Sequence, residues 1–325
     1  MLDEFYIEEL ARKKFSFKSS SFLNGIGDDS AICRINSDKI VVSCDSQVED
    51  VHFSLKYFTP QEIGFRALSV ALSDICAMGA EPKFFLNSLF LPNKTSKKFV
   101  DKLFQGFNKA SKFYNVELVG GNVCKSKSLI VDITVIGETI KNKYIEREGS
   151  NSGDFVYVSG KLGDASLGLS ILKKKSIFNY REKLLISKYK SPKAKVSLGK
   201  FLGQSSFVTS MIDITDGLTL DLARLLGKNS PNKGACLVWE DIPKSDNVSR
   251  TSTMSSFMKS VFSGGDDYEL LFTIKRKKAY EFDLLCKKNN FKVFKIGAVD
   301  SSGSLTLKKG GKISNLQADG FVHKF

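Results

Sequence analysis

Five short acidic clusters interrupt an otherwise basic chain, and each of them borders an apolar run. The chain has 325 residues and a formal net charge of +14. The clusters are Gly25-Ile-Gly-Asp-Asp29, Ser43-Cys-Asp45, Ser73-Asp74, Asp213-Ile-Thr-Asp-Gly217 and Gly264-Gly-Asp-Asp-Tyr-Glu269. Any one of them alone is typical of an ordinary turn. Several carboxylates beside apolar segments instead favour an oxygen-ligand site for Mg²⁺, which binds a few carboxylates together with phosphate oxygens.

Composition places the chain among globular proteins with room for two domains. Hydrophobic residues make up 42% and charged residues 26% of the chain, both ordinary values. No two cysteines have the Cys-x-x-Cys spacing of zinc or redox motifs, which fits a reducing cytosol. Residues 1–14 lack the apolar core of a signal peptide, and no stretch approaches the length of a membrane span. We therefore expect a cytoplasmic location and no membrane partner.

The positive charge alone does not specify a partner. Lysine and arginine are scattered, and the short basic runs have no interleaved aromatic residues. Solvated faces are therefore favoured over a nucleic-acid patch, and no nucleic-acid partner is expected. A non-catalytic nucleic-acid binder remains an alternative that a salt-dependent gel shift would support.

Strand and helix signals alternate through both halves of the chain. The sequence Thr59-Pro-Gln-Glu62 predicts a helix start with a capping box, and the helix ends near Gly79. Asp74 lies in its last turns, where a carboxylate opposes the helix dipole, so we expect a cation partner. Further helices are expected over 96–114, 164–174, 183–191, 218–227 and 277–289, and strands over 39–43, 83–91, 116–119, 129–138, 154–159, 208–214, 270–274 and 291–296.

The pattern predicts a mixed α/β or α+β chain with two domains. Gly149-Ser-Asn-Ser-Gly153 contains only glycine, serine and asparagine and is the best linker candidate. We place the N-terminal domain at 1–149 and the C-terminal α+β domain at 150–325.

Several common nucleotide-site motifs are missing. The chain has no P-loop and no protein-kinase catalytic loop. Gly25-x-Gly lacks the third glycine of a dinucleotide-binding motif. His52 and His323 are the only two histidines, which makes a histidine-rich transition-metal site unfavourable.

The acidic clusters, taken in order with their neighbours, resemble the thiamine-monophosphate kinase family over nearly the whole chain. The matching segments are Gly25–Asp29, Asp45 with Val51–Phe53, Ser73–Pro82, Val119–Asn122, Asp213–Gly217 and Gly264–Phe272. The resemblance implies an aminoimidazole ribonucleotide synthetase-like fold, whose N-terminal domain pairs strands across a dimer. It also implies ATP as co-substrate, several Mg²⁺ ions, thiamine monophosphate as acceptor, and a homodimer.

The resemblance also implies roles for residues of the matching motifs. Acidic, hydroxyl and amide positions would bind metal: Asp29, Ser43, Cys44, Asp45, Asp74, Asn122, Asp213 and Asp216. ATP would contact Phe104, Gly121, Asn122, Arg147 and Thr215. The acceptor would contact His52, Asp266 and Phe321.

Four positions depart from the family pattern. Cys44 stands where threonine is common, and because a thiol is a poor Mg²⁺ ligand, only its backbone carbonyl could serve. Asp50 stands where glycine is usual, which could change the turn before Val51. Phe104 replaces a frequent tyrosine and Phe321 a usual tryptophan.

Other roles are open for three of these residues. His52, taken alone, is more often structural than ligand-binding, and only its motif favours the second role. Arg147 could instead form a surface ion pair with Glu146 or Glu148. Phe321 could instead be a core anchor near the end of the chain.

The implied reaction does not need a general base. The acceptor is a phosphate monoester with a second pKa of about 6, so its attacking oxygen is already ionised at neutral pH. We therefore expect no catalytic acid or base, and direct in-line transfer driven by alignment and metal charge.

Two related enzyme classes lack their expected signals in this chain. A selenophosphate synthetase would need a reactive cysteine and a lysine near the N-terminus, whereas the first cysteine here is Cys33. Hydrogenase-maturation proteins of this superfamily end in a cysteine-bearing tail, whereas this sequence ends Val322-His-Lys-Phe325.

Overall fold

The structure is a computed structural model that describes residues 2–15, 20–24, 26, 30–174, 176–227, 232–245 and 253–322. The chain divides into two units. Unit 1 comprises Met1–Ile75 and Ala80–Asn142, and unit 2 comprises Cys76–Gly79 and Lys143–Phe325. The mixed α/β architecture predicted from the sequence is confirmed.

The predicted linker over 149–153 has an ordered place within unit 2. Ser150 is buried, and Gly153 N donates a hydrogen bond to Val299 O at 2.8 Å. Asn151 N donates to Asp154 Oδ2 at 3.0 Å. A boundary between separately folding domains at 149/150 stays a proposal.

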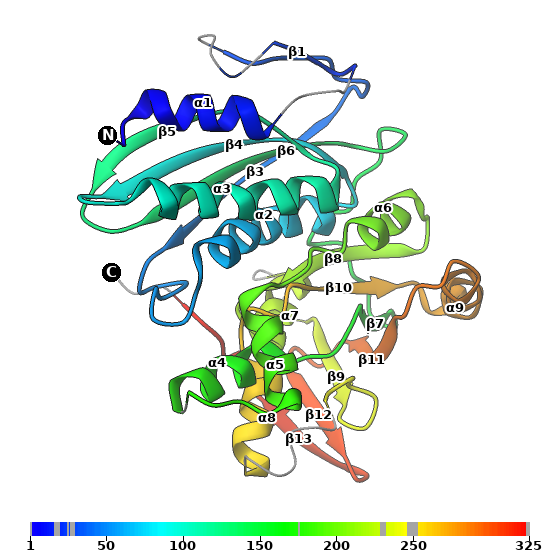
Figure 1. Cartoon of the computed structure of the whole chain (residues 1–325). Coiled ribbons are helices and arrows are strands. Elements are labelled where there is room, and N and C mark those ends of the chain that lie inside the picture. The colour runs from blue at the N-terminus through cyan, green and yellow to red at the C-terminus, as the bar shows by residue number, and fades with distance from the viewer. Residues whose placement is uncertain are drawn as a thin grey trace. The chain divides into compact units, whose positions relative to one another are not determined.

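Unit 1 contains a four-stranded sheet in the order β3-β6-β4-β5. The strands are β3 (Ile40–Val48), β6 (Ile130–Glu138), β4 (Glu81–Pro92) and β5 (Glu117–Ser126) (Figure 1). β6 lies antiparallel to β3 and β4, and β4 is parallel to β5. Alternate residues of β6 are buried and partly exposed, so one face of the sheet is covered and the other, the open face, is not.

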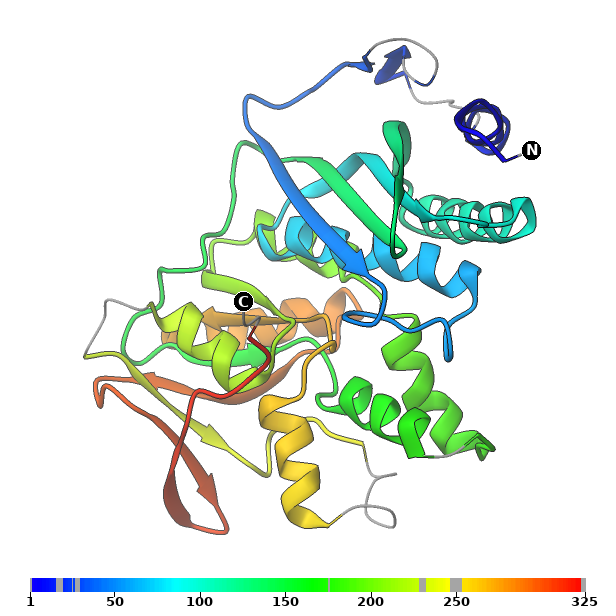
Figure 2. The ribbon, with the colours of Figure 1, turned by 90° about the vertical axis from the view of Figure 1, so that its left-hand side faces the viewer.

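Helices cover the buried face of this sheet. α2 (Pro60–Ala77) and α3 (Lys97–Tyr114) lie side by side there (Figures 1 and 2). α1 (Glu4–Lys14) packs against α3, where Tyr6 Oη donates to Asp101 Oδ2 at 3.0 Å.

The start of α2 agrees with its sequence signals. Thr59 N donates to Glu62 Oε2 at 2.8 Å, and Glu62 N donates to Thr59 Oγ1 at 3.3 Å. This reciprocal pair is the predicted capping box.

The Gly120-Gly121-Asn122 segment differs from its prediction. We expected a strand ending at Val119, but β5 continues through this segment to Ser126. A Cβ at Gly121 would overlap the carbonyl oxygen of Asn87 on β4. Glycine is therefore needed for close pairing with β4 rather than for a turn.

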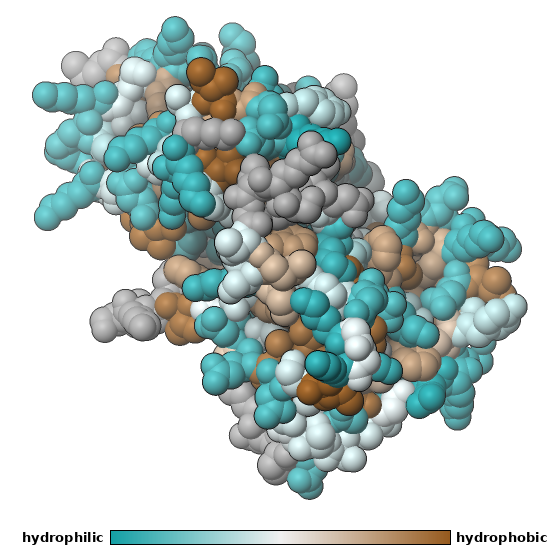
Figure 3. All heavy atoms as spheres, turned by 90° about the horizontal axis from the view of Figure 1, so that it is seen from below, coloured by the Kyte–Doolittle hydropathy of each residue, from teal (hydrophilic) through white to brown (hydrophobic). Residues whose placement is uncertain are grey.

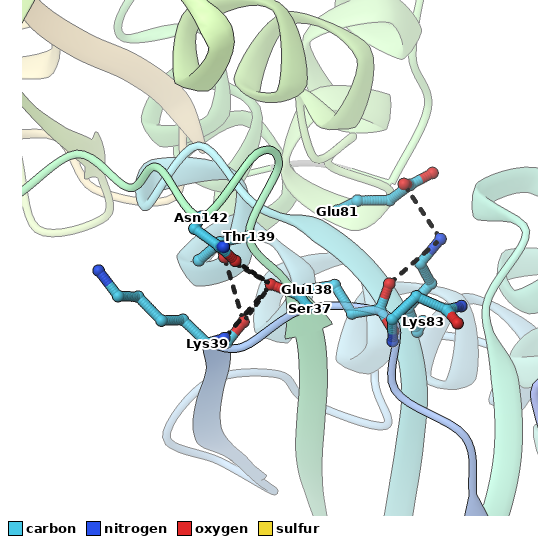
Figure 4. A network of polar contacts seen from close by, with 8 residues as sticks. Ser37, Lys39, Glu81, Lys83, Glu138, Thr139 and Asn142 are labelled. Carbon is cyan, nitrogen blue, oxygen red and sulfur yellow. Dashed lines mark hydrogen bonds and ion pairs between the residues drawn. The ribbon is translucent and has the colours of Figure 1, made fainter.

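A polar network holds the end of the unit 1 sheet where β3 begins (Figure 4). Ser37 Oγ lies 2.8 Å from Thr139 Oγ1 and donates to Asn142 Oδ1 at 3.2 Å. Lys83 Nζ lies 3.0 Å from Glu81 Oε2 and 4.0 Å from Glu138 Oε2. These contacts fix the entry of the chain into β3, which carries Ser43 to Asp45.

Unit 2 contains a seven-stranded sheet in the order β13-β12-β9-β11-β7-β10-β8. All neighbouring pairs are antiparallel except β12 and β9. The strands are β7 (Phe155–Val158), β8 (Val208–Ile214), β9 (Gly234–Val238), β10 (Glu269–Ile274), β11 (Phe294–Asp300), β12 (Leu305–Lys309) and β13 (Lys312–Leu316). Every residue of β10 is buried, so side chains cover this strand on both faces.

Apolar side chains on the two faces of β10 pack against different helices of unit 2. Leu271 belongs to a core cluster with Leu222, Trp239 and Phe262. Phe272 stacks on Tyr157 and meets the ring of Phe282 edge to face. The helices of unit 2 are α4 (Asp164–Lys174), α5 (Tyr180–Lys190), α6 (Val196–Gln204), α7 (Leu218–Leu226), α8 (Met254–Ser263) and α9 (Ala279–Lys288), with a short 3₁₀ turn η2 (Arg276–Lys278).

The remaining described strands, β1 (Phe22–Asn24) and β2 (Ile32–Cys33), form a small antiparallel pair. Over the ranges that the structure covers, none of the helices is long and apolar enough to span a bilayer. On the face shown in Figure 3, hydrophilic residues in teal surround scattered hydrophobic ones in brown.

Candidate functional site

In unit 1, β3 presents two of its three predicted metal residues, Ser43 and Asp45, to helix α2. Ser43 and Asp45 alternate with Cys44, so they share the helix-facing side of the strand. Ser43 Oγ donates a hydrogen bond of 2.5 Å to Asp74 Oδ2. Further along the same side, buried Gln47 accepts from Arg66 Nε of α2 at 3.1 Å. The structure therefore brings Ser43 and Asp74 into contact, on the side of β3 that carries Asp45.

Cys44 faces the other way. Its thiol is on the open face and donates to Asp132 Oδ1 at 2.8 Å, while Thr134 Oγ1 donates to its sulfur at 3.6 Å. The hydrogen bond to Asp132, and then burial, raise the pKa of the Cys44 thiol. The thiol therefore does not join Ser43 and Asp45, which leaves the Cys44 carbonyl as the only donor on that residue for the predicted metal role.

Asn122 also lies in the row of the open face that contains Asp132. The strand register aligns Asn122 with Ser88 on β4, and Ser88 with Asp132 on β6. Asn122 Oδ1 accepts from Val123 N at 2.9 Å, and its Nδ2 donates to Cys124 Sγ at 3.3 Å. The expected unit 1 ligands are thus divided between two faces of one sheet, with Asn122 and the Cys44 thiol on the open face.

Asp132 was not among the predicted site residues. Its only signal in the sequence is an acidic residue within the apolar run Ile130–Ile136. Asp28 and Asp29, which the sequence places first among the acidic clusters, lie outside the described residues.

Phe104 occupies the core of unit 1. Its side chain is only 3% exposed and meets the rings of Phe15 and Phe107 edge to face. The structure gives this ring a packing role, and its contact with ATP stays a prediction.

His52 is oriented by the backbone of β3. Val48 N donates to His52 Nδ1 at 3.0 Å, so the hydrogen-bond pattern assigns the proton of the neutral ring to Nε2. Asp50 adopts a left-handed φ of 61°, and Ser54 Oγ donates to its carboxylate at 3.0 Å. The turn therefore keeps the conformation that a glycine would favour, although aspartate stands there.

In unit 2, the predicted nucleotide turn follows β8 and is held by a buried carboxylate. Asp213 is a buried residue near the end of β8. Asp221 Oδ2 on α7 accepts the backbone N–H groups of Thr215, Asp216 and Gly217 at 3.0, 3.0 and 3.2 Å. Sequence reasoning missed Asp221, whose only signal is a carboxylate inside the apolar helix Leu218–Leu226.

Asp216 has a cationic partner in its own unit. Arg224 Nη1 lies 2.5 Å from Asp216 Oδ2 and 2.7 Å from Asp221 Oδ1. Burial lowers the pKa of Arg224, but the two carboxylates outweigh it and the net pKa is raised. Burial also raises the pKa of Asp221, against the stabilising effect of the backbone N–H groups and Arg224. Arg224 therefore neutralises the carboxylates that border the turn.

Two of the predicted acceptor residues, Asp266 and Phe321, lie beside this turn. Asp266 N donates to Thr215 O at 2.8 Å, and Phe321 N donates to Asp216 O at 3.0 Å. The Phe321 side chain is 48% exposed, which contradicts its alternative role as a core anchor. Thr215, Asp216, Asp266 and Phe321 are thus brought together by main-chain hydrogen bonds.

Arg147 is an exposed residue on the segment that leads into unit 2. Glu146 O accepts from Met211 N at 3.0 Å, which ties this segment to β8. Within the described ranges, Arg147 forms no ion pair with Glu146 or Glu148. Its role as an ATP contact stays a prediction.

The donor sets are of the kind that suits Mg²⁺. Leaving aside the residues that are not described, no three His, Cys, Asp or Glu side chains are grouped closely enough to hold a metal by themselves. Mg²⁺ usually keeps several waters and takes only one or two carboxylates plus phosphate oxygens. The pair of Asp74 with Ser43, and the carboxylate of Asp216, fit that chemistry.

Comparisons with known proteins identify relatives that match most of this chain. Residues 27–139 match the family model described as AIR synthase related protein, N-terminal domain. A thiamine-monophosphate kinase of Buchnera aphidicola subsp. Acyrthosiphon pisum is 35% identical over 295 residues, covering 88% of this chain and 87% of the relative.

Two solved structures extend the comparison to the fold. Thiamine-monophosphate kinase from Stenotrophomonas maltophilia K279a has a TM-score of 0.83 at 25% identity, covering 94% of this chain and 96% of that one. AaThiL complexed with AMPPCP and TMP has a TM-score of 0.74 at 29% identity, covering 98% and 96%. With identity above 30% to a curated relative over most of both chains, this chain belongs to the thiamine-monophosphate kinase family.

Proposed function

We propose that this chain transfers the γ-phosphoryl group of ATP to thiamine monophosphate, giving ADP and thiamine diphosphate. Family membership supports the reaction. The observation that carries the assignment to residues is the set of hydrogen bonds around the Thr215–Asp216 turn. They place the expected nucleotide contact, Thr215, beside the expected acceptor contacts, Asp266 and Phe321.

The acidic clusters are proposed to hold Mg²⁺. In unit 1, Asp45, Asp74 and Ser43 would supply oxygen ligands, together with Asp29. In unit 2, Asp213 and Asp216 would do so. When bound, Mg²⁺ offsets the negative charge of the phosphates that the reaction brings together. Because Arg224 already contacts Asp216 at 2.5 Å, a cation at Asp216 shares its carboxylate with Arg224 or displaces it.

The chain is proposed to act by alignment rather than by general-base catalysis. The acceptor phosphate is ionised at neutral pH, because its second pKa is about 6. His52, oriented by its bond from Val48 N, can donate from Nε2 and would position that phosphate. No covalent enzyme intermediate is needed for direct in-line transfer.

A turnover assay tests the proposed function. The purified chain is incubated with ATP, Mg²⁺ and a small panel of phosphorylated acceptors, and the products are identified by mass spectrometry. Thiamine diphosphate and ADP are expected, and no turnover of thiamine monophosphate would contradict the function. ATP made chiral at the γ-phosphorus tests the mechanism. Inversion fits one direct transfer, and retention would mean two transfers through a covalent intermediate.

We also propose that the chain is a homodimer, paired through the open face of unit 1, and that it works in the cytoplasm. Val42 on β3 is 55% exposed and lies opposite Ile136 on β6, so apolar side chains sit next to each other on this face. Such a face is unfavourable in water unless another surface covers it. None of the six cysteines, all of which the structure describes, forms a disulfide, and this suits a reducing compartment.

Light scattering at micromolar protein is expected to give the mass of a dimer. Ile136→Asp should shift it to the monomer mass, because a charge would then be buried in the interface. Ile313→Asp on β13 is the matched control, since Ile313 is exposed in unit 2. A wild-type monomer, or a dimer that Ile136→Asp leaves intact, contradicts the proposed interface.

A further inference from the structure

The segment that carries Asp266 contains two residues in a conformation that side chains disfavour. Asp266 has a φ of 70° and Tyr268 a φ of 49°. A left-handed backbone brings the Cβ of a residue too close to the next carbonyl oxygen, and tyrosine is rarely found in this conformation. Such conformations persist only where surrounding contacts enforce them.

Asp267, between these two residues, makes the contacts that anchor the segment to α4. Its Oδ2 accepts from Gly163 N at 2.7 Å, and its Oδ1 from Ala165 N at 3.4 Å. The N–H groups of a first helical turn have no partner inside the helix, so an external carboxylate suits them. Gly163 has a φ of 82° and a Cβ there would crowd the backbone of Ser260, so its position is fixed in turn.

Burial raises the pKa of Asp267 well above its usual range, and the nearby carboxylates of Asp164 and Glu269 add to this effect. The two N–H groups oppose it. Asp267 is thus a carboxyl group at a place where its negative charge is unfavourable. A turn at the protein surface would not need a buried carboxyl group of this kind.

The anchoring of Asp267 determines where Asp266 points. Asp266 is held through its backbone by Thr215 O, and its Oδ1 accepts from Tyr268 Oη at 3.2 Å. Tyr268 is itself buried, and its N donates to Ile214 O at 2.9 Å. Asp266 is therefore bonded to the turn that follows β8 and Tyr268 to the last residue of β8, while Asp267 is bonded to the start of α4.

We propose that Asp267 is a positioning residue for the acceptor. By tying its segment to the first turn of α4, it keeps Asp266 and Tyr268 in their left-handed conformations, and thereby directs the Asp266 carboxylate toward thiamine monophosphate. Asp267 does not touch the acceptor. This inference rests on the proposed function, because it takes Asp266 as an acceptor contact.

Steady-state kinetics of Asp267→Ala test the inference. Losing both bonds lets the segment relax, so the KM for thiamine monophosphate should rise about tenfold or more. The KM for ATP should stay within about threefold, because the turn 215–217 keeps its bonds to Asp221. Asp267→Asn retains an oxygen for Gly163 N, so it should restore the acceptor KM to within about threefold of wild type.

Ser245→Ala separates positioning from stability. Ser245 Oγ donates to Asp164 Oδ2 at 3.0 Å in the same part of unit 2. Among the described residues, no hydrogen bond joins Ser245 to the Asp266 segment. It should lower the melting temperature and leave the acceptor KM unchanged.

Tyr268→Phe keeps the test open if Asp267→Ala does not fold. It removes only the hydroxyl that reaches Asp266, and it should raise the acceptor KM about threefold. An acceptor KM unchanged in Asp267→Ala and Tyr268→Phe overturns the inference, as does an equal rise in both KM values. A wild-type chain that does not phosphorylate thiamine monophosphate instead overturns the proposed function.

Discussion

Asp74→Asn is expected to abolish phosphoryl transfer while leaving the chain folded. Asp74 lies in the last turns of α2, where a negative charge is unfavourable for the helix dipole. The Ser43 hydroxyl that donates a hydrogen bond to Asp74 carries no charge that would offset it. A carboxylate kept in such a place suits a cation that arrives with the nucleotide. Since asparagine has the same shape but no charge, kcat should fall roughly a thousandfold or more.

The measurement pairs turnover with circular dichroism and a melting curve. Asp101→Asn makes the same change on α3, where the carboxylate accepts from Tyr6 Oη, and it should retain turnover. Wild-type activity in Asp74→Asn would remove Asp74 from the metal site, whereas a loss of helical signal would show that its role is structural.

Asp221→Ala should give the largest loss of stability among substitutions at the unit 2 turn. It leaves three backbone N–H groups without their acceptor and deprives Arg224 of one of its two carboxylates. A buried hydrogen-bonding group left without its partner costs about 1–3 kcal/mol in the free energy of unfolding, and three N–H groups are affected here. Because Thr215 and Asp216 lose their fixed geometry, ATP affinity should fall as well.

Urea denaturation gives the free energy, and titration with ATP and Mg²⁺ gives the affinity. Asp300→Ala is the control, because Asp300 accepts from Ser302 N and Oγ in an exposed turn and should cost less than about 1 kcal/mol. An Asp221→Ala protein as stable as Asp300→Ala would show that the turn holds its shape without Asp221.

Local signals predicted the elements well wherever neighbouring residues decide the structure. The capping box at Thr59 and Glu62 set the start of α2, and the apolar run 208–214 matches β8. The strand that contains Gly120 and Gly121 was wrongly predicted to end at Val119, because Gly121 allows the close approach of Asn87, 34 residues away in sequence. A contact between distant segments leaves no periodic pattern to read.

The candidate site shows the same difference between residues that sequence motifs reveal and residues that only contacts between distant segments reveal. Motif resemblance found Thr215, Asp216, Asp266 and Phe321, which the structure brings together. It did not find Asp221, which belongs to no motif, and it gave no role to Asp267, although that residue lies inside the Gly264–Glu269 cluster. Both carboxylates accept from backbone N–H groups of another segment, which a motif does not reveal. Side chains alternate between the two faces of a strand, so the sequence of β3 could have separated the Cys44 thiol from Ser43 and Asp45. The pairing of β3 with β6 was needed to show that Asp132 accepts the hydrogen bond of that thiol.

The hydrogen bonds from the segment 319–321 have a consequence for synthesis of the chain. Thr219 Oγ1 donates to Asp319 O at 2.9 Å, across 100 residues of sequence, and Phe321 N reaches back to Asp216 O. The ribosome therefore synthesises the turn after β8 well before the residues 319–321 that form hydrogen bonds around it. During translation, this part of unit 2 folds without those hydrogen bonds. Products of premature termination before Asp319 would carry every acidic cluster and still lack these hydrogen bonds, so the end of the chain would not hold the turn after β8.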